Sequence, residues 1–392
     1  MKLRSCVFLI CLVGVLGACQ DNEEEIKPAE KVSRTVLAYI IGDNGRNDLS
    51  SLLRGNFNDM VKGMEAVNSL DCNMLVYSVM IDEAPCLIRL KKEGQKVIAD
   101  TLVVYDGKEN PLDKEVMKKV MSYAFDYFPA DSYGYVFLSH AAGWIPATTK
   151  ASRSIGAYRN TSMDIDEFRD VLSDVDKHLD FILFDACFMQ SVEVAYELRD
   201  KVDYFIGSPT EIPGPGAPYD ELMECFFNKG NVAFDIAKSY YKSYEGKYTG
   251  YAPASNANWT GGVSVSVIKG DVLDELAEKT KWIFSKYAKS ASVSDIMCYD
   301  LSGSKYYYDL DGVIRVLTQG NEGDYEIWRR VFEKARPYWG TTLKNYSGYT
   351  RNVFSMEGAE GISTYIPSGV NTSKNNIYYR TYDWATATGW GI

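Results

Sequence analysis

Histidine is scarce in this chain of 392 residues, which holds only His140 and His178. Two imidazoles cannot supply the ligands of a histidine-rich metal site, so that class of centre is excluded. Positive charge is also in deficit, because 42 Lys and Arg residues face 53 Asp and Glu residues and leave a net charge of −11. Nucleic-acid binding depends on clustered Lys and Arg that neutralise phosphates, so this balance argues against a nucleic-acid partner. Internal repeats and low-complexity tracts are absent too, and the hydrophobic share of 46% allows a sizeable core.

Cysteine usage excludes two further classes of protein. Three of the eight cysteines fall within the first 19 residues, and the others are Cys72, Cys86, Cys187, Cys225 and Cys298. Their wide, irregular spacing fits neither a disulfide scaffold nor a zinc site, whose ligands come in close pairs. Five is an odd number of cysteines, so in an exported protein at least one of these thiols stays outside intramolecular disulfides.

The apolar run at the amino terminus is too short for a membrane span. In "MKLRSCVFLICLVGVLGACQ", a basic start precedes a short apolar stretch and a region of small residues, which is typical of an export signal. Charge follows too soon for a stable membrane helix. "LGAC", which ends at Cys19, resembles the lipobox of bacterial lipoproteins. The resemblance implies a signal peptide over residues 1–18 and a lipid on the Cys19 sulfur; an ordinary cleaved signal with a bystander cysteine is the alternative.

The following residues, 19–33, form a tether rather than part of a core. They include "QDNEEEIKPAEK", which is acidic and has little apolar surface, as flexible linkers do. Acidic residues directly after the cysteine also resemble the surface-export signal of Bacteroidota lipoproteins. We therefore expect a protein of the bacterial cell envelope, at the outer membrane or cell surface, that contacts the membrane only through its lipid.

Strand-like and helix-like segments alternate in the next part of the chain. The buried-strand patterns are "RTVLAYIIG" (34–42), "NMLVYSVMID" (73–82), "GYVFLSH" (134–140), "LDFILFDA" (179–186) and "VDYFIGSPT" (202–210). Strands that are apolar on both faces and alternate with helices belong to a parallel sheet covered on both sides. We therefore predict an α/β core over 34–230, while 231–392 completes the sheet or forms an appended subdomain. "CLIRLKKEGQKVIADTLVVYDG" indicates a hairpin, and "GISTYIP" (361–367) a late strand.

His140 and Cys187 each follow one of these strands. Because parallel strands joined by a right-handed crossover end at the same edge, we expect both side chains at one rim. The chain turns into a helix around "SVEVAYELRD", so the helix dipole and a nearby imidazolium would favour the Cys187 thiolate. That pair is a nucleophile and a general acid that protonates a leaving amine. The alternative is a cysteine and a histidine that only fill the core.

Two motifs then resemble a known family. "LSHAAGW" and "ILFDACFMQSVEVAYELRDKVDYFIGSPTEIPGPGAPY" are similar to the His and Cys motifs of clostripain-like cysteine peptidases, in the clan of caspases, legumains and gingipains. "RTVLAYIIGDN" and "GISTYIP" resemble family strands near the two ends, so the similarity covers most of the chain. The resemblance implies a caspase-like three-layer α/β/α sandwich that hydrolyses peptide bonds through His140 and Cys187 alone. It also implies an oxyanion hole formed by the N–H groups of Cys187 and Ala141.

The same resemblance implies a specificity and a maturation step. The family prefers Arg or Lys before the scissile bond; Asp185 matches its acidic position, and Glu211 is a second carboxylate that could instead be a solvated loop acid. Self-cleavage after a basic residue often matures the family, and the loop at 145–160 offers Lys150 and Arg153. Some clostripain-type enzymes need calcium, but no calcium-loop pattern is visible, so we expect no cofactor.

One departure from the family concerns the residue after the histidine. The family has glycine there, in strings such as "SHGTGW", whereas this chain reads "SHAAGW". If the glycine adopts positive φ, Ala141 strains or re-aims the oxyanion amide, and a lost donor lowers turnover by about a hundredfold or more. The sequence thus predicts an exported cysteine endopeptidase, with a non-catalytic surface lipoprotein that binds peptide or protein ligands as the alternative.

Overall fold

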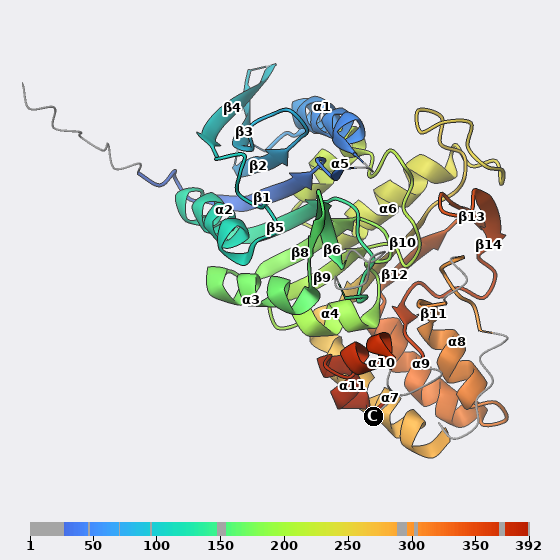
Figure 1. Cartoon of the computed structure of the whole chain (residues 1–392). Coiled ribbons are helices and arrows are strands. Elements are labelled where there is room, and N and C mark those ends of the chain that lie inside the picture. Colours follow the sequence, from blue (N-terminus) through green and yellow to red (C-terminus); the bar gives the residue numbers. More distant parts are fainter. Residues whose placement is uncertain are drawn as a thin grey trace, which may run out of the picture.

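The chain folds into a central sheet with helices on both faces (Figure 1). The computed structural model describes residues 27–45, 48–69, 71–94, 96–146, 154–287, 296–301, 305–367 and 373–390. Cys19, Lys150 and Arg153, which the sequence singles out for lipidation and self-cleavage, lie outside these residues. None of the helices in the described ranges has the length and apolar character needed to cross a membrane.

Within the described ranges the sheet has nine strands, in the order β12-β10-β9-β8-β5-β1-β2-β3-β4. The central, parallel strands are β1 (Val32–Ile41), β2 (Cys72–Val79), β5 (Ala130–Leu138), β8 (Leu179–Asp185) and β9 (Val202–Gly207). Antiparallel strands extend both edges: β3 (Cys86–Glu93), β4 (Lys96–Val104), β10 (Ser264–Lys269) and β12 (Tyr338–Thr341). The predicted α/β fold with a mostly parallel sheet is therefore confirmed.

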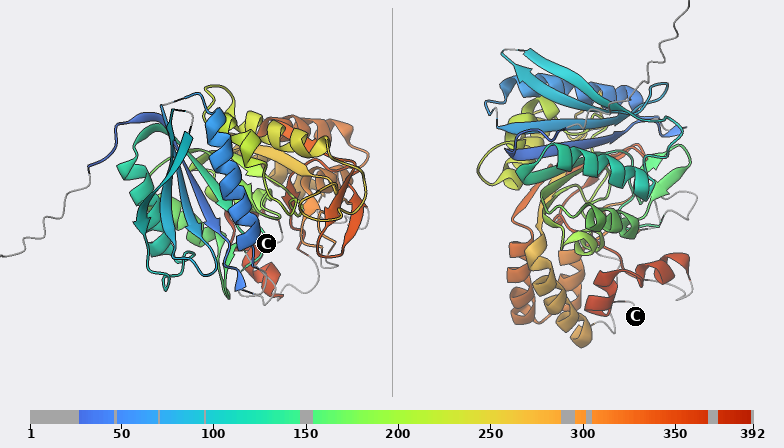
Figure 2. Two further views of the ribbon diagram at one scale, coloured as in Figure 1. Left: turned by 90° about the horizontal axis from the view of Figure 1, so that it is seen from above. Right: turned by 90° about the vertical axis from the view of Figure 1, so that its left-hand side faces the viewer.

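Successive residues of β1 enter two different cores, because neighbouring side chains of a strand point to opposite faces. Val36 and Ile40 pack in the core beneath α1 (Ser50–Ala66), α5 (Tyr219–Phe226) and α6 (Val232–Glu245). Leu37 and Ile41 pack in the core beneath α2 (Lys114–Tyr127), α3 (Ile165–Val175) and α4 (Val192–Leu198). Figure 2 shows α1 and α2 on opposite sides of the sheet. This double burial explains why the strand reads as a continuous apolar run.

The chain after α6 adds β10 and β12 to the sheet and places further helices at one end of the molecule (Figure 2). These helices are α7 (Leu273–Tyr287), α8 (Leu310–Leu317), α9 (Glu322–Ala335), α10 (Lys374–Tyr379) and α11 (Asp383–Thr388). Short strand pairs are β6 (Ile155–Tyr158) with β7 (Thr161–Met163), β11 (Tyr308–Asp309) with β15 (Ser363–Thr364), and β13 (Lys344–Ser347) with β14 (Asn352–Ser355).

The late strand predicted over 361–367 is shorter than expected, because only Ser363 and Thr364 pair in β15. The backbone N–H of Ser363 donates to the Gln190 carbonyl, and that of Tyr365 donates to the Glu193 carboxylate. The N–H groups of Ser363 and Tyr365 therefore donate to the turn and helix that follow β8, and they do not pair with a long neighbouring strand.

Two buried glutamates of α4 hold this carboxy-terminal segment. Glu193 Oε1 accepts from Thr364 Oγ1 at 2.8 Å and from the Tyr365 N–H at 2.9 Å. Glu197 accepts from the backbone N–H of Asp383. Burial raises the pKa of Glu193 and of Glu197 to about 7, and the hydrogen bonds oppose this rise.

The two carboxyls should make the fold more stable in mild acid. A glutamate in the unfolded chain has a pKa near 4.5, so between pH 4.5 and 7 the unfolded chain releases a proton that the folded chain retains. Stability therefore falls as the pH rises through this window. For Glu193 alone we expect a loss of about 2 kcal/mol between pH 5 and pH 7.5. Denaturant titrations at both pH values measure it. Glu193→Gln should remove about half of the pH dependence, because Glu197 still titrates; a slope equal to wild type in that variant contradicts the assignment.

Candidate active site

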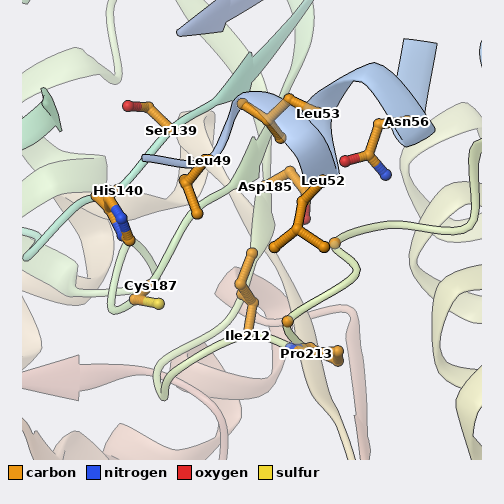
Figure 3. A pocket seen from close by; sticks show the side chains of 12 residues that line it. Leu49, Leu52, Leu53, Asn56, Ser139, His140, Asp185, Cys187, Ile212 and Pro213 are labelled. Atoms are coloured by element: carbon orange, nitrogen blue, oxygen red, sulfur yellow. The ribbon is translucent and has the colours of Figure 1, made fainter. Parts of the chain in front are cut away.

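His140 and Cys187 come from neighbouring strands of the sheet. β5 and β8 run parallel, and their register pairs Leu138 with Asp185. Each candidate residue lies two positions after one member of that pair, so both chains leave the sheet at the same edge. His140 and Cys187 both line one cleft, and Figure 3 shows the imidazole pointing toward the thiol. The structure thus brings the two residues to one rim, as the strand pattern predicts.

Cys187 lies in a tight turn that its neighbours hold in place. Phe188 has a left-handed backbone with φ of 61°, which is uncommon for a residue with a side chain. Its N–H donates to the Thr210 carbonyl at 2.9 Å, and its ring stacks on Tyr307 with centroids 4.4 Å apart. Tyr307 in turn donates from its hydroxyl to the Ala142 carbonyl, in the segment after His140. The strained turn therefore links the two halves of the rim.

The helix argument for Cys187 is wrong. α4 begins at Val192, and Ser191 caps it by accepting from the Val194 N–H at 3.3 Å. The turn separates the thiol from the first helical N–H groups, and the dipole effect fades within one helical turn. The dipole of α4 therefore gives no support for a Cys187 thiolate.

The strain expected at Ala141 is also absent. Among the described residues, positive φ at a non-glycine occurs at six positions, and Ala141 is not one of them. Ala141 instead pairs with Ile155 in an isolated antiparallel bridge, an extended conformation that alanine adopts readily. The residue that must be glycine is Gly143, which has φ of 57° and whose Cβ would lie 2.5 Å from the Phe188 carbonyl oxygen. Ala141, which stands where the family has glycine, therefore occupies a position at which the backbone tolerates a side chain.

This geometry predicts opposite outcomes for two substitutions. Gly143→Ala forces the strained turn and the segment after His140 apart, so we expect peptide turnover to fall by about 5- to 150-fold, from a cost of roughly 1–3 kcal/mol. Ala141→Gly relieves no strain and should leave turnover within about twofold of wild type. Steady-state hydrolysis and melting temperatures of both purified variants measure this, and a hundredfold gain in Ala141→Gly would contradict it.

The cleft beside the two residues has apolar walls and an acidic floor. Its empty volume is about 490 Å³, which includes space open to solvent. Leu49, Leu52 and Leu53, at the start of α1, form one side, and the loop from Ile212 to Gly216 forms another (Figure 3). Asp185, the last residue of β8, also lines it. Such a cleft suits a long apolar side chain that ends in a positive charge.

Asp185 is buried without a cation. Its Oδ2 accepts from the Ala217 N–H and the Tyr219 hydroxyl, each at 2.9 Å, and its Oδ1 from the Tyr240 hydroxyl at 3.1 Å. Burial raises the pKa of this carboxyl, and the three hydrogen bonds oppose the rise. No described Lys, Arg or His forms an ion pair with it. Gly216 approaches closely, since a Cβ there would lie 2.7 Å from Asp185 Oδ2.

Glu211 has a different setting from the one the sequence suggests. Its carboxylate accepts from Ser347 Oγ at 2.5 Å and from the N–H groups of Gly348 and Tyr349 at 2.9 and 3.3 Å. These donors belong to the β13–β14 hairpin, and Glu211 is not among the residues that line the cleft. The carboxylate therefore fixes the hairpin to the loop that precedes Ile212, instead of meeting the contents of the cleft.

His178 lies away from the cleft. His178 is exposed and pairs with Asp203 at 2.7 Å, at the opposite end of β8 from Cys187. No group of three or more His, Cys, Asp and Glu side chains in the described part of the chain could hold a metal ion. None of the five described cysteines forms a disulfide with another.

The sequence reasoning missed the side of the cleft that α1 provides. His140 was located because parallel strands end at one edge of the sheet, where site residues gather. The same reasoning applies to β1, because the loop after Ile41 leaves the sheet at that edge. The helix that starts at Ser50 therefore had to begin beside the rim. Leu49, Leu52 and Asn56 could have been proposed from this signal.

Comparisons with known proteins find relatives among cysteine proteases. The model of the clostripain family matches residues 38–391. A secreted C11 cysteine protease from Bacteroides thetaiotaomicron, solved with an irreversible peptide inhibitor, is 42% identical, with a TM-score of 0.83 over 92% of this chain and 99% of that one. An inactive zymogen C11 protease from Parabacteroides distasonis is 31% identical, with a TM-score of 0.79 over 92% and 99% of the two chains.

A curated relative matches over a shorter stretch. Clostripain from Hathewaya histolytica is 27% identical over 125 residues, which are 29% of this chain and 24% of that protein. The alignment thus spans about a quarter of the length of that relative. The family match covers nearly the whole chain, as the His and Cys motifs suggest, and the chain belongs to the clostripain family of cysteine peptidases.

Proposed function

We propose that this protein is an exported cysteine endopeptidase that cleaves peptide bonds after Arg or Lys, with Cys187 as nucleophile and His140 as its acid–base partner. The observation that carries the proposal is one cleft that joins both residues to a buried carboxylate without a cation, Asp185. A buried charge of this kind is costly unless it is paired, so the cleft is suited to a positively charged side chain.

The reaction follows from these positions. The Cys187 thiolate attacks the carbonyl carbon of the scissile bond, and the N–H groups of Cys187 and Ala141 stabilise the oxyanion that forms. The His140 imidazolium gives its proton to the leaving amine, which departs as the new amino terminus. His140, now neutral, takes a proton from water, whose oxygen attacks the thioester. The C–S bond of the thioester then breaks and the carboxylic acid product leaves. The Cys187 thiolate is restored beside the His140 imidazolium, which keeps the proton taken from water.

The cleft supports the proposed preference for Arg or Lys. The leucines of the α1 side can pack along the methylene groups of either side chain, whose charged ends then reach Asp185.

Maturation and location complete the proposal. Self-cleavage after Lys150 or Arg153 fits the basic specificity, and a relative solved as an inactive zymogen supports a maturation step in the family. Analysis of intact mass, with Cys187→Ala as the uncut control, tests this. A lipid on Cys19 would hold the enzyme in the cell envelope, and the resemblance to a secreted relative agrees with export.

The proposal is tested by hydrolysis of three reporter peptides that differ only in the residue before the scissile bond: Arg, Lys or the neutral norleucine. Wild-type protein should cleave the first two, and Cys187→Ala should cleave none of them. Because this substitution removes only the sulfur of a residue in the cleft, an unchanged melting temperature shows that the fold is intact. Equal hydrolysis by wild type and Cys187→Ala would exclude the proposed nucleophile.

A further inference from the structure

Asn56 presents an acceptor that nothing in the described chain uses. The residue is 3% exposed, and its Nδ2 donates to the Pro215 carbonyl at 2.9 Å. Its Oδ1 is buried, and no described residue donates a hydrogen bond to it. An unsatisfied buried acceptor costs free energy, and the great majority of such groups in native proteins have a partner. Figure 3 shows this oxygen pointing toward Asp185 and the cleft, and the nitrogen pointing away.

The oxygen lies near the Asp185 carboxylate. A Cβ built on Gly216 would be 2.7 Å from Asp185 Oδ2 and 3.4 Å from Asn56 Oδ1, so the two oxygens are at most about 6 Å apart. One cationic group with several N–H donors can contact both acceptors across such a span. The hydrogen bond to Pro215 fixes the amide, so its oxygen cannot turn away from the cleft without losing that contact.

Asp185 alone has too few acceptor positions for a basic side chain. An ionised carboxylate offers about four lone-pair positions, and donors from Ala217, Tyr219 and Tyr240 already use three. A lysine ammonium has three N–H donors and an arginine guanidinium five. The Asn56 carbonyl adds two positions to the one that remains, and it does so without a second buried negative charge.

We propose that Asn56 is a specificity residue of the cleft, whose Oδ1 accepts a hydrogen bond from the Arg or Lys side chain held by Asp185. This inference rests on the proposed function, because it assigns a second contact to the same substrate side chain. The ligand class is a primary ammonium or guanidinium on an alkyl chain.

Two variants separate the acceptor from the structural contact. Asn56→Leu removes both the acceptor and the donor to Pro215, whereas Asn56→Asp removes the donor and keeps an oxygen in the cleft. At pH 8 we expect Asn56→Leu to lower kcat/KM for the Arg and Lys reporters by about 10- to 100-fold, and Asn56→Asp to stay within about fivefold of wild type. Alkylation of Cys187 by iodoacetamide, which carries no positive charge, should change by less than twofold in both.

Three outcomes decide the inference. Wild-type kcat/KM in Asn56→Leu overturns it. Equal losses in both variants, with slower alkylation of Cys187, also overturn it, because they mean that Asn56 only holds the Pro215 loop. If wild-type protein cleaves no reporter, the proposed peptidase activity fails separately, and calorimetric binding of agmatine, a guanidinium on a butyl chain, then tests Asn56. Weaker agmatine binding by Asn56→Leu than by Asn56→Asp supports the acceptor role, and equal binding overturns it.

Discussion

Replacing Asp185 with asparagine should lower kcat/KM for reporters with Arg or Lys before the scissile bond by on the order of a thousandfold. The substitution removes the Asp185 carboxylate from the lining of the cleft, and a buried cation without its partner costs several kcal/mol. The fold should survive, because the asparagine oxygen can accept from Ala217 and Tyr219, and the Tyr240 hydroxyl can turn to accept from the amide NH₂. Steady-state kinetics on the Arg, Lys and norleucine reporters measure the effect.

The matched control for Asp185 is the other acid that the sequence singles out. Glu211→Gln removes a charge that the β13–β14 hairpin already binds, so the selectivity for Arg over norleucine should stay the same. If the selectivity for Arg over norleucine survives Asp185→Asn but collapses in Glu211→Gln, then Glu211 rather than Asp185 recognises the basic side chain, and the assignment made here is wrong. Alkylation of Cys187 by iodoacetamide shows in both variants that the rim is intact.

Replacing His140 with alanine should lower kcat by about 10²- to 10⁴-fold, the usual contribution of a positioned acid–base group. Without the imidazole, the thiolate fraction falls and the leaving amine receives no proton. His178→Ala is the control, because His178 is exposed and lies at the other end of β8. Kinetics at saturating Arg reporter should show near wild-type turnover for His178→Ala; a comparable loss in both variants would point to a general effect on stability.

The alternation of strands and helices predicted the central sheet well, and physical reasons explain this. Runs such as the one around Leu37 are apolar on both faces only when helices cover both sides, so they indicate parallel strands directly. Order along the chain then predicted that His140 and Cys187 would share an edge. Strand ends are local features, and a local pattern suffices to locate them.

The parts that sequence reasoning could not give depend on contacts between distant segments. The short β15 reflects hydrogen bonds to Gln190 and Glu193, which lie far away in the sequence. The role of Glu211 depends on the hairpin at 344–355, and the tolerance for Ala141 depends on a bridge to Ile155. The helix near Ser191 was predicted correctly, but Cys187 was wrongly placed at its start, because the turn between them has no glycine to mark the positive φ of Phe188.

The reactivity of Cys187 toward iodoacetamide between pH 5 and pH 9 tests the central claim most directly, since that claim is that His140 activates this thiol at a shared rim. Three of the other described cysteines are internal references, because burial raises the pKa of Cys72 and of Cys225 to about 11 and that of Cys298 to about 12. Quantitative mass spectrometry of the alkylated peptides should show Cys187 reacting at pH 6 at least tenfold faster than these three. His140→Ala should abolish that advantage. A Cys187 that reacts no faster than the reference cysteines, or equally fast with and without His140, would contradict the account.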